Sequence, residues 1–97
     1  MTQYRRGTTV EYWCRNQLHE DGFGLVIRSA GSKGPFDLVA IGENAIKLIQ
    51  VKRVGGGKVP SFAEELAAMR EVPAPPCVSK ELWIFVDERK TWTILPV

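Results

Sequence analysis

The chain has 97 residues, a net charge of +2 and a hydrophobic share of 44%. This length suits a single domain over residues 1–97, and the hydrophobic share excludes a disordered chain. No run approaches the roughly 18 consecutive apolar residues of a membrane span, and no apolar segment follows the basic N-terminus. We therefore expect a cytoplasmic protein without a signal peptide. The short length would also suit a protein of a virus or mobile element.

The charge is unevenly distributed along the chain. Residues 1–60 carry nine Lys or Arg against five Asp or Glu, a net +4, and the remainder carries four against six, a net −2. A basic N-terminal half is compatible with a polyanionic partner such as nucleic acid. Uneven surface charge without a function explains the same distribution almost as well.

Apolar spacing predicts a helix near the N-terminus. Thr8 or Thr9 can cap its start, and Gly22 fits the position that ends it after about Asp21. Its apolar stripe consists of Val10, Trp13, Cys14 and Leu18. Three strands are then expected over 24–29, 36–41 and 45–53, with a loop at 30–35 and a tight turn at 42–44.

The second half is predicted to hold one helix and two strands. Ser61 can cap a helix that runs from Phe62 to about Glu71. A proline-rich connector at 73–76, strands over 82–86 and 92–95 and a charged turn at 87–90 complete the chain. The aromatic residues expected in the core are Trp83, Phe85 and Trp92. The order α-β-β-β-α-β-β predicts an α/β fold, a central mixed five-stranded sheet flanked by helices.

Gln50 and Lys52 share one face of the third predicted strand, because residues two apart in a strand point the same way. Asp37 lies at the start of the preceding strand, and hairpin pairing brings 36–38 roughly opposite 50–52. A lysine among apolar neighbours is expected to have an anionic partner or a functional role. A carboxylate, an amide oxygen and an ammonium group can therefore converge at one end of the hairpin. An ordinary Asp37–Lys52 salt bridge explains the same spacing.

This set of groups suits phosphodiester hydrolysis. Oxygen atoms of Asp37 and Gln50, with the backbone carbonyl of Val51 and waters, are ligands for Mg²⁺, which polarises a phosphate and activates water. Lys52 can orient that water or offset charge on the phosphorane oxygens. Glu11, near the start of the first helix, is the natural further acid, although it could equally lie on a solvated face.

Asp37 followed by Gln50-x-Lys52 resembles the PD-(D/E)xK nuclease signature, and the element order is similar to that superfamily's core. The resemblance implies a restriction-endonuclease-like fold. Over about residues 4–53, four motifs in order resemble the archaeal-type Holliday junction resolvases more narrowly. These are Arg6-Gly7-x-x-x-Glu11, Gly22-Phe23, Arg28-Ser29-Ala30-Gly31-Ser32-Lys33 and Asp37-Leu38-Val39-Ala40.

The resemblance implies a homodimeric endonuclease that cuts two opposed strands of a four-way DNA junction, in DNA recombination and repair. It implies that Glu11, Asp37 and Gln50 bind Mg²⁺, with Mn²⁺ as a substitute, and that Lys52 is catalytic. Position 50 is Gln where these resolvases usually have Glu. The site therefore has one negative charge fewer, which should weaken its hold on the metal.

The resemblance also implicates Arg28 and a serine of the following loop in cutting, Ser32 rather than Ser29. The candidate DNA contacts are Arg5, Arg6, Arg28, Ser29, Ser32, Lys33, Arg53 and Lys58. Gly55-Gly56-Gly57-Lys58 lacks the spacing of a phosphate-binding P-loop, so no nucleotide cofactor is expected. The alternatives are a related nuclease acting on flaps, ends or duplex DNA, and a non-catalytic DNA-binding relative.

Overall fold

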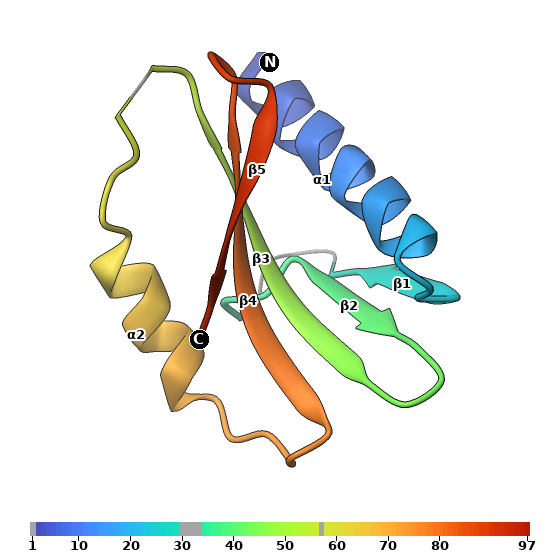
Figure 1. Ribbon diagram of the computed structural model, residues 1–97. Helices are drawn as coiled ribbons and strands as arrows, with labels where there is room; N and C mark the ends of the chain where they lie inside the picture. The colour runs from blue at the N-terminus through green and yellow to red at the C-terminus, as the bar shows by residue number, and fades with distance from the viewer. Residues whose placement is uncertain (1, 30–33, 57) are drawn as a thin grey trace.

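The computed structural model describes residues 2–29, 34–56 and 58–97, and for residues 2–8 the backbone alone. The elements in these ranges are α1 (Thr2–Glu20), β1 (Leu25–Arg28), β2 (Leu38–Ile41), β3 (Ile46–Val54), α2 (Ala63–Glu71), β4 (Val78–Val86) and β5 (Thr91–Pro96). The strands form one sheet in the order β1-β2-β3-β4-β5, antiparallel except for the parallel pair β3–β4. The predicted α/β element order and mixed five-stranded sheet flanked by helices are confirmed (Figure 1).

The start of α1 differs from the prediction. The helix begins at Thr2, so the prediction that Thr8 or Thr9 caps it is wrong. Val10, Cys14 and Leu18 are buried and anchor the later turns against the sheet. A helix nucleated in this way adds one hydrogen bond for each residue it gains, so it extends through residues of lower intrinsic propensity.

The end of α1 is confirmed at glycine. Gly22 has a φ of 101°, a left-handed conformation that glycine adopts without steric cost. Its N–H donates to the carbonyl of His19 at 3.1 Å, and the N–H of Phe23 donates to the carbonyl of Leu18 at 3.0 Å. This pair of bonds is a Schellman motif, which satisfies the last carbonyl groups of the helix.

The hairpin of β2 and β3 is shifted by one residue from the expected pairing. β2 begins at Leu38, which pairs with Ile49 rather than with Gln50. Asp37, just before the strand, donates its backbone N–H to the carbonyl of Ile49 at 2.8 Å. Beyond this point β3 continues to Val54 without β2 beside it. The two strands therefore part at Asp37.

The start of α2 also differs from the prediction. Phe62 is the N-cap residue, with a φ of 53°, and no side chain caps the helix there, so the predicted cap at Ser61 is wrong. Phe62 instead packs against the core on this side of the sheet. The far end of α2 is held by Lys80 of β4, whose Nζ donates to the carbonyl of Met69 at 2.9 Å and of Val72 at 2.6 Å. The ammonium group thereby satisfies carbonyls at the helix C-terminus.

Two clusters of buried side chains lie on opposite faces of the sheet, one under each helix (Figure 1). The cluster under α1 includes Trp83, which is 1% exposed, with Phe85 and Trp92 packed against it. The predicted core position is confirmed for Trp83, whereas Phe85 and Trp92 are only partly buried at its margin. The cluster under α2 is centred on Met69 and on Leu82, Ile84 and Val86 of β4. Neither helix in the described ranges has the length and apolarity needed to cross a membrane.

Candidate functional site

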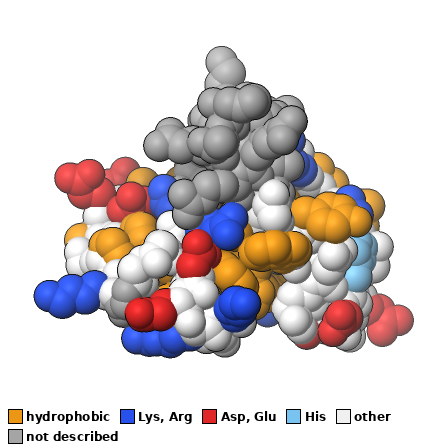
Figure 2. Space-filling model, turned by 90° about the horizontal axis from the view of Figure 1, so that it is seen from above, with side chains coloured by type: hydrophobic (Ala, Val, Ile, Leu, Met, Phe, Trp, Pro, Cys, Tyr) orange, Lys and Arg blue, Asp and Glu red, His pale blue; other side chains and the backbone are white. Residues whose placement is uncertain are grey.

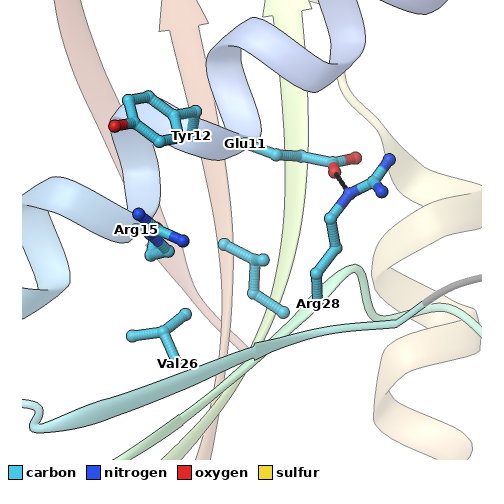
Figure 3. A pocket seen from close by; sticks show the side chains of 6 residues that line it. Glu11, Tyr12, Arg15, Val26 and Arg28 are labelled. Atoms are coloured by element: carbon cyan, nitrogen blue, oxygen red, sulfur yellow. Dashed lines mark hydrogen bonds and ion pairs between the residues drawn. The ribbon is translucent and has the colours of Figure 1, made fainter.

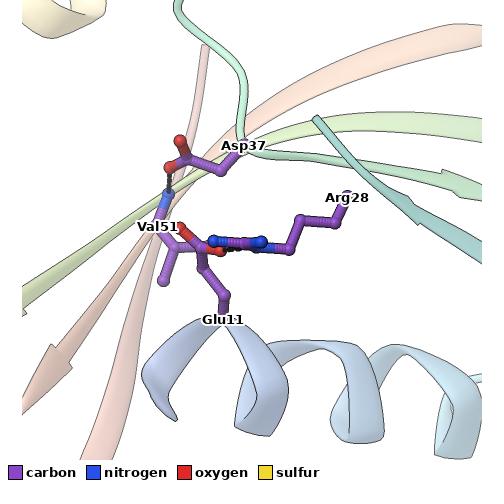
Figure 4. A network of polar contacts seen from close by, with 4 residues as sticks. All are labelled: Glu11, Arg28, Asp37 and Val51. Carbon is purple, nitrogen blue, oxygen red and sulfur yellow. Dashed lines mark hydrogen bonds and ion pairs between the residues drawn. The ribbon is translucent and has the colours of Figure 1, made fainter. Parts of the chain in front are cut away.

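Asp37 lies where β2 and β3 part, and its side chain is held there by the backbone. Its Oδ2 accepts a hydrogen bond from the N–H of Val51 at 2.8 Å (Figure 4). Val51 follows the last residues of β3 that pair with β2. The carboxylate thus accepts the hydrogen bond that a backbone carbonyl of a paired strand would otherwise accept. The N–H and C=O of one residue in an antiparallel strand point to the same edge, so the Val51 carbonyl also faces this gap.

Glu11 approaches the same region from α1. Its Oε1 accepts a charge-assisted hydrogen bond from Nε of Arg28 at 2.6 Å, and in Figure 4 the two side chains meet on the α1 side of Val51. Arg28 is the last residue of β1, so three elements contribute to this corner of the molecule. The sequence did not indicate that Glu11 and Arg28 would pair, because 17 residues separate them.

The pKa of Asp37 is raised above its ordinary value, chiefly because the carboxyl group is partly buried and also because the Glu11 carboxylate is close. The hydrogen bond from Val51 opposes this rise, as do the charges of Lys52 and Arg28. Asp37 therefore lies within electrostatic reach of two predicted site residues, Glu11 and Lys52, and of Arg28. A raised pKa of this origin marks a carboxylate that an additional cation would stabilise in its charged form.

Gln50 and Lys52 belong to the other face of the sheet. Ile49 and Val51 are buried on the α1 side, and strand alternation turns Gln50 and Lys52 toward α2. The Nζ of Lys52 lies 3.8 Å from Oε2 of Glu65 in α2. Glu65 was not among the predicted site residues; the signal for it in the sequence was an acidic first turn in the second helix, shared with Glu64.

The Oε1 atom of Gln50 is buried and has no hydrogen-bond partner within the described ranges. Buried acceptors are nearly always satisfied, so a buried amide oxygen without a partner is a candidate for cation binding. Three or more His, Cys, Asp or Glu side chains do not gather around one point anywhere in those ranges. The predicted metal ligands are two carboxylates, one amide and one backbone carbonyl. All four are oxygen donors, which fits a hard divalent cation such as Mg²⁺.

The remaining predicted DNA contacts are placed unevenly. Ser32, Lys33 and the side chains of Arg5 and Arg6 lie outside the described residues. Ser29 is exposed, and its N–H donates to the carbonyl of Asp37 at 2.8 Å, so its backbone is tied to the candidate site.

Arg53 is 2.8 Å from Oδ1 of Asp87, and its guanidinium lies 5.4 Å from the ring centre of Trp13. Lys58 is exposed. Figure 2 shows the end of the molecule where α1 begins, and there the basic side chains alternate with acidic and hydrophobic ones. Among the described side chains on this face, the basic groups therefore do not form one continuous patch.

The structure brings Glu11, Arg28, Asp37 and Val51 together on one side of the sheet and Gln50, Lys52 and Glu65 on the other. Asp37 is near both groups because it sits at the opening between β2 and β3. Comparison with models of known protein families finds no match for this chain, and comparison with curated proteins finds none either.

Proposed function

We propose that this protein is a metal-dependent endonuclease with a restriction-endonuclease-like fold that resolves four-way DNA junctions. The observation that carries the proposal is the position of Asp37. It lies where two strands part, its pKa is raised, and Glu11, Arg28 and Lys52 all act on it. The motifs that resemble the Holliday junction resolvases supply the substrate class.

In this proposal the carboxylates of Glu11 and Asp37 and the Val51 carbonyl would hold Mg²⁺, or Mn²⁺ in its place. The Gln50 amide oxygen, which belongs to the opposite face of the sheet, would have to reach the ion where β2 and β3 part. When bound, the ion polarises the phosphate and favours attack by water. Water forms a new bond to phosphorus while the bond to the 3′ oxygen breaks, which leaves a 5′-phosphate and a 3′-hydroxyl.

Lys52 has the role of stabilising charge on the phosphate oxygens. Glu65 keeps the flexible side chain of Lys52 oriented. Arg28 moves from Glu11 to a DNA phosphate, which frees the Glu11 carboxylate for the cation. Ser32 assists the cut from the adjoining loop. The remaining proposed DNA contacts are Arg5, Arg6, Ser29, Lys33, Arg53 and Lys58.

A second copy of the chain is the proposed partner, because two opposed strands must be cut. The sheet face turned away from α1 exposes Leu25 by 53% and Ile27 by 47%. Their strand neighbours Val39 and Ile41 are also aliphatic and only partly buried. Such an uncharged aliphatic surface suits self-association. Light scattering should give twice the monomer mass, and Ile27→Lys should return it to the monomer value.

The decisive experiment compares cleavage of a four-way junction and of linear duplex of the same sequence, with Mg²⁺ and with EDTA. Asp37→Asn should lower cleavage by about 100-fold or more while leaving junction binding in place. Asp21→Asn is the matched control, because Asp21 is exposed at the far end of α1, where its Oδ1 accepts a hydrogen bond from Gln17. Undiminished cutting by Asp37→Asn would overturn the proposed site.

A non-catalytic DNA-binding relative is the second candidate. The neutral amide of Gln50 favours it, as does the Arg28 guanidinium that neutralises Glu11. Tight junction binding without cutting in either Mg²⁺ or Mn²⁺ would support this candidate. Equal cutting of junction, flap and duplex would instead support a nuclease of broader substrate range.

A further inference from the structure

A hollow of about 200 Å³ lies between α1 and β1, beside the Glu11–Arg28 pair (Figure 3). Its lining residues are Glu11, Tyr12, Arg15, Val26, Arg28 and Leu38. In Figure 3 the labelled side chains of α1 and β1 face one another across it. A water molecule occupies about 30 Å³ of liquid, so this volume is large enough for a phosphate ester or part of a nucleoside.

Basic groups outnumber acidic ones among the residues that line the hollow. Two guanidinium groups, of Arg15 and Arg28, face one carboxylate, that of Glu11. Arg28 is paired with Glu11, whereas Arg15 is exposed and has no carboxylate partner among the described residues. Guanidinium groups match phosphate oxygens in geometry and charge, so Arg15 is available to bind a phosphate at this hollow.

The lining of the hollow also includes the aromatic side chain of Tyr12 and the aliphatic side chains of Val26 and Leu38. The Tyr12 ring is in a residue that is 54% exposed, and the Arg15 guanidinium lies 4.9 Å from its centre. Val26 and Leu38 form the apolar part of the lining. An exposed aromatic ring next to an arginine that has no carboxylate partner among the described residues is a combination that can stack a base and neutralise its phosphate.

We infer that this hollow is a nucleotide subsite, in which Arg15 binds a DNA phosphate and Tyr12 stacks on the attached nucleoside. The inference rests on the proposed function, because Glu11 belongs both to the hollow and to the proposed metal site. The bound nucleotide is then a neighbour of the phosphate that is cut. Tyr12 and Arg15 position the strand, and neither touches the reacting atoms.

The test measures binding of a labelled single-stranded oligonucleotide in EDTA, where no cutting can occur. Tyr12→Leu should weaken binding by about 5- to 150-fold, the range for loss of one stacked base. Arg15→Ala should weaken it and lower the slope of log affinity against log salt by about 0.7, the value for one phosphate contact on a single strand. Arg70→Ala, the same change at an exposed position in the last turn of α2, is the matched control and should lower neither quantity comparably.

Competition distinguishes a nucleotide subsite from a simple anion site. A nucleoside monophosphate should displace the oligonucleotide at lower concentration than inorganic phosphate does, and Tyr12→Leu should remove that difference. Equal competition by the two in the wild-type protein would overturn the nucleoside part of the inference. Circular dichroism checks that each variant is folded.

The outcome separates this inference from the proposed function. If the wild-type protein cuts junctions but Tyr12→Leu and Arg15→Ala bind like Arg70→Ala, the subsite is refuted and the nuclease stands. If these two variants lose binding while the wild-type protein cuts no DNA, the subsite stands and the nuclease proposal fails.

Discussion

The two faces of the sheet are covered to different extents. α1 packs along β1, β2 and β3, and its cluster reaches Trp83 of β4. α2 packs mainly on β4 and leaves the same face of β1 and β2 open, so that Leu25 and Ile27 stay about half exposed. The covered face contains Glu11, Arg28 and the hollow beside them. The half-covered face contains Lys52 and Glu65.

One face of the sheet is therefore closely packed, whereas the other keeps exposed apolar side chains. The long helix provides most of the burial and also carries the residues that line the hollow. The short helix cannot span the sheet, so its face keeps an apolar surface without a cover. Asp37 lies where β2 and β3 part, and its carboxylate interacts electrostatically with Glu11 of one face and Lys52 of the other.

The largest effect on the free energy of unfolding is expected from shortening a buried side chain under α1. Leu18→Ala should lower the free energy of unfolding by about 2–5 kcal/mol, because Leu18 is fully buried and its removal leaves a cavity. Ile27→Ala on the open part of the sheet should cost less than about 1 kcal/mol in dilute solution. Urea denaturation of both variants measures the contrast. Equal losses would show that the two faces do not differ as described.

The end of α1 provides the next largest effect. Gly22→Ala should cost about 1–2 kcal/mol, because alanine is strained at a φ of 101°. Gly24→Ala is the control, since a Cβ atom there meets nothing within 4 Å and its φ is not left-handed. Thermal unfolding of the two variants should separate by several degrees. A Gly24→Ala protein as unstable as Gly22→Ala would contradict the strain at Gly22.

The raised pKa of Asp37 predicts a pH-dependent difference between the wild-type protein and Asp37→Asn. The folded state holds this proton more tightly than the unfolded chain does, so the charged carboxylate costs stability at neutral pH. As the pH falls through the raised pKa, the wild-type protein should gain stability relative to Asp37→Asn. Denaturant curves at several pH values measure this difference, and the opposite slope would indicate a lowered pKa.

The smallest effect is expected on the α2 side. Glu65→Gln should change the free energy of unfolding by less than about 0.5 kcal/mol, because Lys52 and Glu65 are each 34% exposed and their charges are screened. Ser61→Ala should be equally mild, since Ser61 does not cap α2. Chemical denaturation in low and high salt is the measurement. A loss above about 1 kcal/mol in Glu65→Gln would mean that this pair matters to the fold.

Much of the fold was predictable from local patterns. Alternation of side chains identified the strands, and the predicted apolar stripe identified α1, because burial of one face imposes its period on the sequence. Of that stripe Val10, Cys14 and Leu18 are buried, whereas Trp13 is 38% exposed. Gly22 was identified because few residues tolerate its backbone conformation. The start of α1 at Thr2 and the N-cap position of Phe62 before α2 were missed, since tertiary packing outweighed the local capping preferences of Thr8, Thr9 and Ser61.

The candidate site was likewise predictable only in part. The sequence alone determined the order of the elements, the shared face of Gln50 and Lys52, and the place of Asp37 near the mouth of a hairpin, because each depends on spacing of a few residues. Only the tertiary structure decided that Glu11 pairs with Arg28, that Lys52 meets Glu65, and that Arg15 and Tyr12 border a hollow. Those contacts join different elements of the fold, and no local preference encodes the distance between them.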